Sequence, residues 1–152
     1  MGKNHSYALL LFSIFKTPIG ETYGLVDRLL NIIAFADYVD HIIMTYDEFE
    51  NGIKYLIKNK LVVVKTRRII ETTKNLIISN KFKNWYKKTM KNEKQISLVK
   101  ELEIIENYLD KLDEEGKIDN EIEIKIKINK DDFEDKRKYY IAIMYCIPSG
   151  IT

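Results

Sequence analysis

Residues 44–60 read MTYDEFENGIKYLIKNK, and they contain the clearest helix start in the chain. Thr45 followed three residues later by Glu48 is a capping box, in which each side chain can bond a free backbone N–H at the helix entrance. Met44, just before the cap, and Phe49, at the fourth helical position, are placed to form the matching hydrophobic staple. These signals predict a helix that begins directly after Thr45.

Apolar side chains then repeat at helical spacing and would give this helix one buried stripe, made of Phe49, Ile53, Leu56 and Ile57. Asn59 and Lys60 end the pattern. Because asparagine tolerates the left-handed conformation that is common at a helix exit, we expect Asn59 to end the helix in that way.

Two helices are expected before this stretch. Residues 7–15 are apolar except for Ser13, which predicts a largely buried first helix that is too short to span a bilayer. Pro18 and Gly20 then break the helix. Thr22 can cap a second helix that runs to about residue 38, with an inner face of Leu25, Leu29, Ile32, Ile33 and Ala36. A short turn leads from there to residues 44–60, which is the order of a helix-turn-helix.

Two short apolar runs follow, at residues 61–64 and 69–72, and both favour strands. Residues 65–68 link them as a basic turn whose cations are Lys65, Arg67 and Arg68. Thr72 or Thr73 can cap a further helix, with an inner face of Leu76, Ile77, Phe82, Trp85 and Tyr86. Its outer face carries Lys81, Lys83, Lys87, Lys88 and Lys91.

Residues 95–115 form the longest helical pattern in the chain. Their apolar positions step by four and three, as in a coiled coil, and comprise Leu98, Leu102, Ile105, Leu109 and Leu112. The seam covers only about two heptads, fewer than a coiled coil usually needs. Two interpretations therefore stay open: the helix packs on its own domain, or the seam pairs two chains in a homodimer.

The C-terminal part mixes strand and helix signals. Residues 121–128 alternate isoleucine with charged residues, which predicts a half-buried strand. Asn129 with Asp132 is typical of a helix start, and the spacing of later apolar residues favours a helix over residues 131–146. Residues 139–147 are also rich in strand-favouring types, so a strand is the alternative for the tail.

The charge of the chain is segregated along its length. Residues 54–94 hold 13 Lys and Arg against two Glu, whereas residues 1–53 and 95–152 are both net acidic, although the whole chain carries only +2. Such a basic middle between acidic ends says more about partners than the total charge does. The single Cys146 excludes an internal disulfide framework and fits a reducing cytoplasm, so we expect a cytoplasmic protein.

Residues 7–86 resemble the winged helix-turn-helix domains of small bacterial proteins, on the strength of residues 36–41 (ADYVDH), 45–49 (TYDEF), Gly52 and 56–61 (LIKNKL). The resemblance implies a mainly helical fold with a small β component. It places a winged-helix domain at residues 1–92. A C-terminal extension at residues 93–152, with a long helix, a strand and the tail, would pack on that domain.

In such domains the third helix enters the DNA major groove and the wing touches the backbone. The resemblance thus implies groove-facing roles for Tyr46, Asp47, Glu50, Asn51, Lys54 and Lys58, and wing roles for Lys65, Arg67 and Arg68. The first turn departs from this chemistry, because Asp47 and Glu50 would repel phosphates where a DNA reader usually presents Arg, Asn, Gln or Ser. The expected function is a DNA-binding transcriptional regulator. The alternative is a protein-binding immunity protein or antitoxin that uses the acidic residues against a basic toxin.

Enzyme signatures are absent from the sequence, which has no Gly-rich phosphate loop and no Gly-x-Ser-x-Gly elbow. His41 beside Asp37 and Asp40 could be drawn as a metal or acid–base cluster. A turn histidine with hydrogen-bonding acidic neighbours explains it more simply. We therefore expect a protein without catalytic activity, metal or cofactor.

Overall fold

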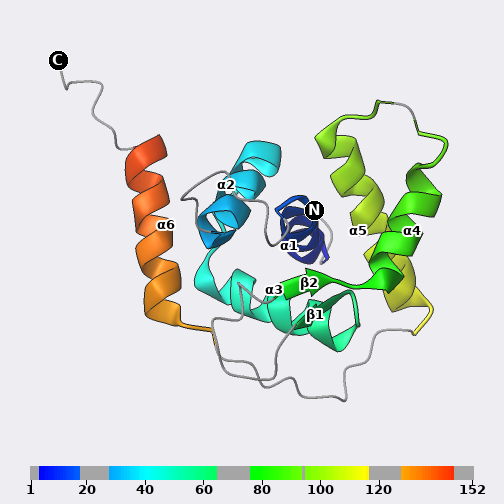
Figure 1. Cartoon of the computed structure of the whole chain (residues 1–152), viewed down its shortest axis with the longest axis horizontal. Helices are drawn as coiled ribbons and strands as arrows, with labels where there is room; N and C mark the ends of the chain where they lie inside the picture. Colours follow the sequence, from blue (N-terminus) through cyan, green and yellow to red (C-terminus); the bar gives the residue numbers. More distant parts are fainter. Residues whose placement is uncertain (1–3, 18–27, 65–75, 94, 117–127, 146–152) are drawn as a thin grey trace.

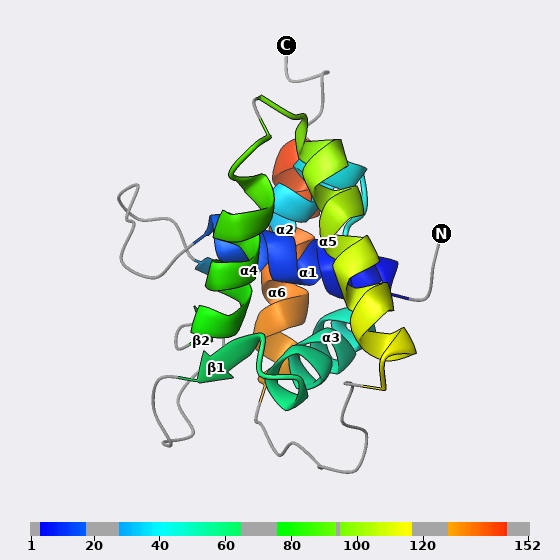
Figure 2. The same cartoon turned by 90° about the vertical axis from the view of Figure 1, so that its right-hand side faces the viewer.

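The computed structural model describes residues 4–17, 28–64, 76–93, 95–116 and 128–145, and the account below is confined to them. The first helix, α1 (His5–Lys16), passes through the middle of the molecule (Figures 1 and 2). It packs against helices α2 (Arg28–Asp40), α3 (Tyr46–Lys58) and α5 (Leu98–Glu114). Every side chain of α1 from position 8 to position 14 is buried, as expected for a helix that is apolar on all sides.

Helix α3 begins as the sequence predicts. The Thr45 hydroxyl accepts from the Glu48 amide at 3.2 Å, and the Glu48 carboxylate accepts from the Thr45 amide at 3.0 Å, which completes the capping box. The helix exit differs from the prediction. Asn59 has a φ of −93°, and its side chain donates to the Tyr55 carbonyl, while the left-handed residue is Lys60 with a φ of 60°.

A two-stranded antiparallel ribbon follows α3 and consists of β1 (Val62–Val64) and β2 (Leu76–Ile78). Val62 pairs with Ile78, and Val64 pairs with Leu76. The prediction that Leu76 and Ile77 belong to a helix is therefore wrong. Ile77 and Ile78 are β-branched, as are the residues of β1, and this cross-strand pairing prevails over a helix at these positions.

Helix α4 (Asn80–Met90) starts after Ser79, whose hydroxyl accepts from the Phe82 amide, and not after Thr72 or Thr73. The strand predicted at residues 69–72 lies outside the described residues, as do Thr22, Leu25 and most of the strand predicted at residues 121–128.

The tail is a helix, α6 (Lys130–Met144), so the helical alternative is confirmed and the strand alternative is wrong as far as Met144. The Asn129 side chain accepts from the Asp132 amide at 3.0 Å, and this cap sets the start of the helix. Helix α6 lies along α2 at one end of the long axis, and α4 lies at the other end (Figure 1).

The seam of α5 faces the core of its own chain. Leu102, Ile105, Leu109 and Leu112 are all buried, and α5 packs against α1 (Figure 2). The interpretation of this seam as a homodimer interface is therefore corrected. A central helix that is apolar on all sides needs an apolar partner on each flank, and α5 supplies one.

Candidate nucleic-acid interface

The outer face of α3 carries a single polar stripe opposite its buried side. Four residues at spacings of four, three and four form this stripe, which we call the α3 stripe: Asp47, Asn51, Lys54 and Lys58. Asp47 and Asn51 are exposed, and the two lysines are half-buried. The α3 stripe thus runs from acidic at the start of the helix to basic at its end.

Tyr46 does not belong to this stripe, although it was expected to face a ligand. Its hydroxyl donates to Glu50 at 2.5 Å and lies 3.4 Å from the Ile128 carbonyl. Its ring packs edge-on against Phe133 of α6, and Lys130 lies over it. The start of α6 therefore covers Tyr46, which makes it a packing residue between α3 and α6.

Glu50 is held as an anion by its neighbours. The hydrogen bond from Tyr46 and the nearby Lys54 ammonium, 3.4 Å away, lower the pKa of Glu50. Burial and the hydrogen bond to Glu50 raise the pKa of Tyr46 to about 12, so the phenol stays neutral. Lys54 therefore offsets the negative charge of Glu50. Asp47 remains the exposed carboxylate of the first turn of α3.

The basic end of α3 meets the start of α4. The Lys81 ammonium donates to the Asn59 carbonyl at 3.2 Å, which joins the C-terminal turn of α3 to the first turn of α4. Lys58 and Lys60 flank that carbonyl on the chain. The structure thus brings together two groups of lysines that are more than 20 residues apart in sequence.

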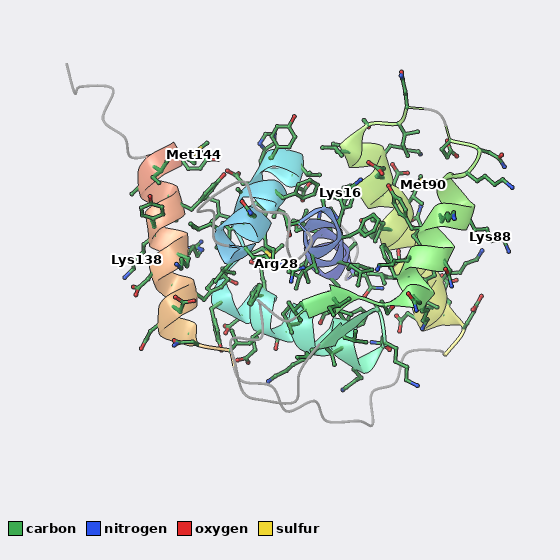
Figure 3. The ribbon with its side chains drawn as sticks, in the orientation of Figure 1. Lys16, Arg28, Lys88, Met90, Lys138 and Met144 are labelled. Carbon is green, nitrogen blue, oxygen red and sulfur yellow. The ribbon has the colours of Figure 1, made fainter. Side chains whose placement is uncertain are left out.

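Helix α4 continues this basic surface. It exposes Lys81, Lys83, Lys87 and Lys88, and Lys91 follows at its C-cap, while the helix itself contains no acidic residue. Lys88 projects from the outer edge of the molecule (Figure 3). The inner side of α4 packs through Phe82, Trp85 and Tyr86 against α1 and α5, as the sequence predicts. Lys65, Arg67 and Arg68 lie outside the described residues.

The metal or acid–base cluster that could be drawn around His41 does not form. His41 is exposed, with a left-handed φ of 54°, and its amide donates to the Asp37 carbonyl at the end of α2. The Asp37 carboxylate accepts instead from the hydroxyls of Tyr140 in α6 and of Tyr145 at its C-cap. His41 therefore ends α2 and has no acid–base partner among these groups.

Sequence reasoning missed a different histidine. The ring of His5 lies between two carboxylates, with Nε2 at 2.6 Å from Asp40 and Nδ1 at 2.9 Å from Glu106. Burial alone would lower the pKa of His5, but the two carboxylates outweigh it and raise the pKa above 6.5. The carboxylates occupy opposite sides of the ring, so they do not converge on one point. Among the described residues, no His, Cys, Asp and Glu side chains are grouped to hold a metal ion.

Nothing local in the sequence marks His5, because its partners come from α2 and α5. The same holds for Arg137, whose guanidinium donates to the Met44 carbonyl at 2.8 Å and ties α6 to the α2–α3 turn. Arg137 thus helps to position α3, whereas His5 joins α1 to α2 and α5, and neither belongs to the α3 stripe or to the exposed lysines of α4.

Comparisons of the chain with protein-family models, with curated proteins and with solved structures found no match. In the part of the chain that the structure describes, no helix combines the length and the hydrophobicity that crossing a membrane requires.

Proposed function

We propose that this chain is a non-enzymatic winged-helix protein that binds DNA as a transcriptional regulator, with the C-terminal half of α3 towards the groove. The observation that carries the proposal is the basic surface that begins at Lys54 and Lys58 and continues across the Lys81–Asn59 contact onto α4. Cationic side chains of this kind neutralise phosphates and supply the sequence-independent part of DNA affinity.

The order of elements supports the same proposal. Three helices are followed by an antiparallel ribbon, and the chain between its strands includes Lys65, Arg67 and Arg68. In a winged helix this connection reaches the DNA backbone beside the third helix. Asn51, exposed at the middle of the α3 stripe, is the residue suited to read a base edge, since asparagine can form two hydrogen bonds to adenine.

Fluorescence anisotropy of a labelled mixed-sequence DNA duplex tests this proposal. Affinity should fall linearly on a log–log plot between about 50 and 200 mM salt, because each neutralised phosphate adds about 0.9 to the slope. The double variants K54Q/K58Q and R67A/R68A should weaken binding to all sequences alike. The single variant K138Q, on α6 at the end of the molecule opposite to Lys88 (Figure 3), should bind as the wild type does. Absence of binding at about 50 mM salt would refute the proposal.

A second candidate function rests on the acidic start of α3. Asp47 is exposed in the first turn, and Glu50 is kept ionised by Tyr46 and Lys54. Carboxylates at this position repel DNA phosphates and complement a basic protein surface, as in an immunity protein or antitoxin that binds a toxin. Co-expression with the product of an adjacent toxin-like gene tests this candidate: the wild type should restore growth, and the D47K variant should not.

A further inference from the structure

The outer face of α4 carries a row of exposed lysines. Lys83, Lys87 and Lys91 follow one another at spacings of four, so their Cβ atoms are about 5–6 Å apart along one row. Lys88 lies beside this row, and all four side chains are exposed. At about 1.5 Å per residue the row spans roughly 12 Å.

Among the residues that the structure describes, these four lysines have no charged partner. Within the described part of the chain, none of them forms an ion pair, whereas the lysines of α3 and α5 that lie near acids do, as at Lys54–Glu50 and Lys100–Glu103. Like charges at spacings of four destabilise a helix by about 0.2–0.5 kcal/mol per pair. The helix dipole favours cations in the last turn, where Lys87 and Lys88 lie, so the helix tolerates this row. An external polyanion would relieve the repulsion that remains between the side chains.

The chemistry of the same face argues against a membrane as that polyanion. A helix that lies on an anionic membrane inserts apolar side chains between its cations. Helix α4 exposes no large hydrophobic side chain, because Phe82 is fully buried and Trp85 and Tyr86 are directed into the protein. Its exposed face consists of lysine and asparagine alone.

The aromatic residues of α4 also argue for a duplex over a single strand. Proteins that bind single strands stack exposed aromatic rings on unpaired bases. The Trp85 ring is already stacked on Tyr108 of α5, with centroids 4.0 Å apart and planes 19° apart, and Phe82 lies against it. Helix α4 therefore offers charge to a phosphate backbone and no free ring to a base.

We propose that Lys83, Lys87, Lys88 and Lys91 form a second contact to the phosphate backbone of double-stranded nucleic acid, beyond the footprint of α3. This inference rests on the proposed DNA binding, and it assigns a part of the affinity that does not depend on sequence. The contact at Lys81–Asn59 joins the first turn of α4 to the end of α3, which links the two groups of lysines.

The test compares the triple variant K83Q/K87Q/K91Q with a control triple variant, K100Q/K111Q/K138Q. The control removes the same charge from exposed lysines of α5 and α6. Glutamine has nearly the helix propensity of lysine, so both variants should fold, which circular dichroism checks. The α4 variant should lower the slope of log affinity against log salt by about 2–3 and weaken duplex binding at least about tenfold at low salt. The control should match the wild type.

The outcomes separate this inference from the proposed function. If the wild type does not bind duplex DNA, both fail together. If the wild type binds and the α4 variant keeps its salt slope, the α4 contact is refuted and the role of α3 stands. Two further results would also refute it: tighter wild-type binding to a single strand of the same length, or binding to vesicles of anionic phospholipid that the α4 variant loses while its DNA binding is unchanged.

Discussion

The Nε2 atom of His5 lies 2.6 Å from the Asp40 carboxylate, which joins the first turn of α1 to the last residue of α2. The other ring nitrogen is 2.9 Å from Glu106 of α5. Since each nitrogen faces a carboxylate, the doubly protonated ring satisfies both contacts and the neutral ring satisfies one. Nearby, the Asn4 amide donates to Asp110 of α5. Three helices are thus joined at one titratable group.

This arrangement predicts that stability falls with rising pH. The folded state raises the pKa of His5, so it binds the proton more tightly than the unfolded chain does. The contribution is fully present below the unfolded pKa of about 6.5 and is lost as the pH rises through the folded pKa.

Urea denaturation from about pH 6 to pH 9 should show this loss of stability. The H5Q variant should flatten the profile of stability against pH and should cost about 1–3 kcal/mol at the acidic end. His41 is exposed, so H41Q is the matched control. An H5Q profile parallel to that of the wild type would contradict the prediction.

A second prediction concerns the attachment of α6. The Asp37 carboxylate is buried in α2 and accepts from the Tyr140 hydroxyl at 2.6 Å. The Y140F variant removes this donor and should lower the free energy of unfolding by about 1–2 kcal/mol. Tyr139 is next in the chain and is exposed, so Y139F should change stability little. Chemical denaturation measures both variants, and equal losses would show that the Asp37 contact does not hold α6.

How far the sequence predicts this fold depends on how local each signal is. The capping box at Thr45 and the Asn129 cap act within four residues, and both are found where they were expected. The cap of α4 is not predicted correctly, because threonine at 72 or 73 and serine at 79 are all residue types that cap helices. The pairing of Leu76 with Val64 decides where the helix can begin, and that pairing is a long-range contact.

The same distinction between local signals and long-range contacts holds for the candidate site. Helical periodicity alone places Asn51, Lys54 and Lys58 on one face of α3 and the lysines of α4 on an outer face. Helical periodicity does not predict that α6 covers Tyr46, because Phe133 is 87 positions away in the chain. It could not find the His5 contacts either, since Asp40 and Glu106 belong to other helices.

The seam of α5 gives a third prediction. If it paired two chains, replacing Ile105 by lysine would give a soluble monomer. Ile105 is instead fully buried within one chain, so I105K should prevent folding, and I105A should cost about 2–5 kcal/mol. Val99, on the same helix, is 60% exposed, and V99A should stay within about 0.5 kcal/mol of the wild type. Thermal denaturation measures the stability of each variant, and light scattering measures its oligomeric state. A folded, monomeric I105K from a dimeric wild type would contradict the intramolecular packing.

The last prediction concerns the contact of α3 with α1 at Gly52. A Cβ atom built at this position would lie 2.5 Å from Leu10 Cδ2, and Leu10 is fully buried. At an exposed helical site, alanine in place of glycine would add about 1 kcal/mol of stability. Here overpacking should dominate, and G52A should lose about 1–3 kcal/mol.

A double-mutant cycle separates the clash from other effects of the substitution. The variant L10V shortens the side chain that the new Cβ would meet, so G52A should cost less in the L10V background than in the wild type. Equal costs in the two backgrounds would show that Leu10 is not the obstacle. Because Gly52 sets how closely α3 packs on α1, we also expect G52A to shift the α3 stripe. The shift should weaken DNA binding, although the charge of the stripe stays the same. Anisotropy on the folded fraction would show a lower affinity with an unchanged salt slope.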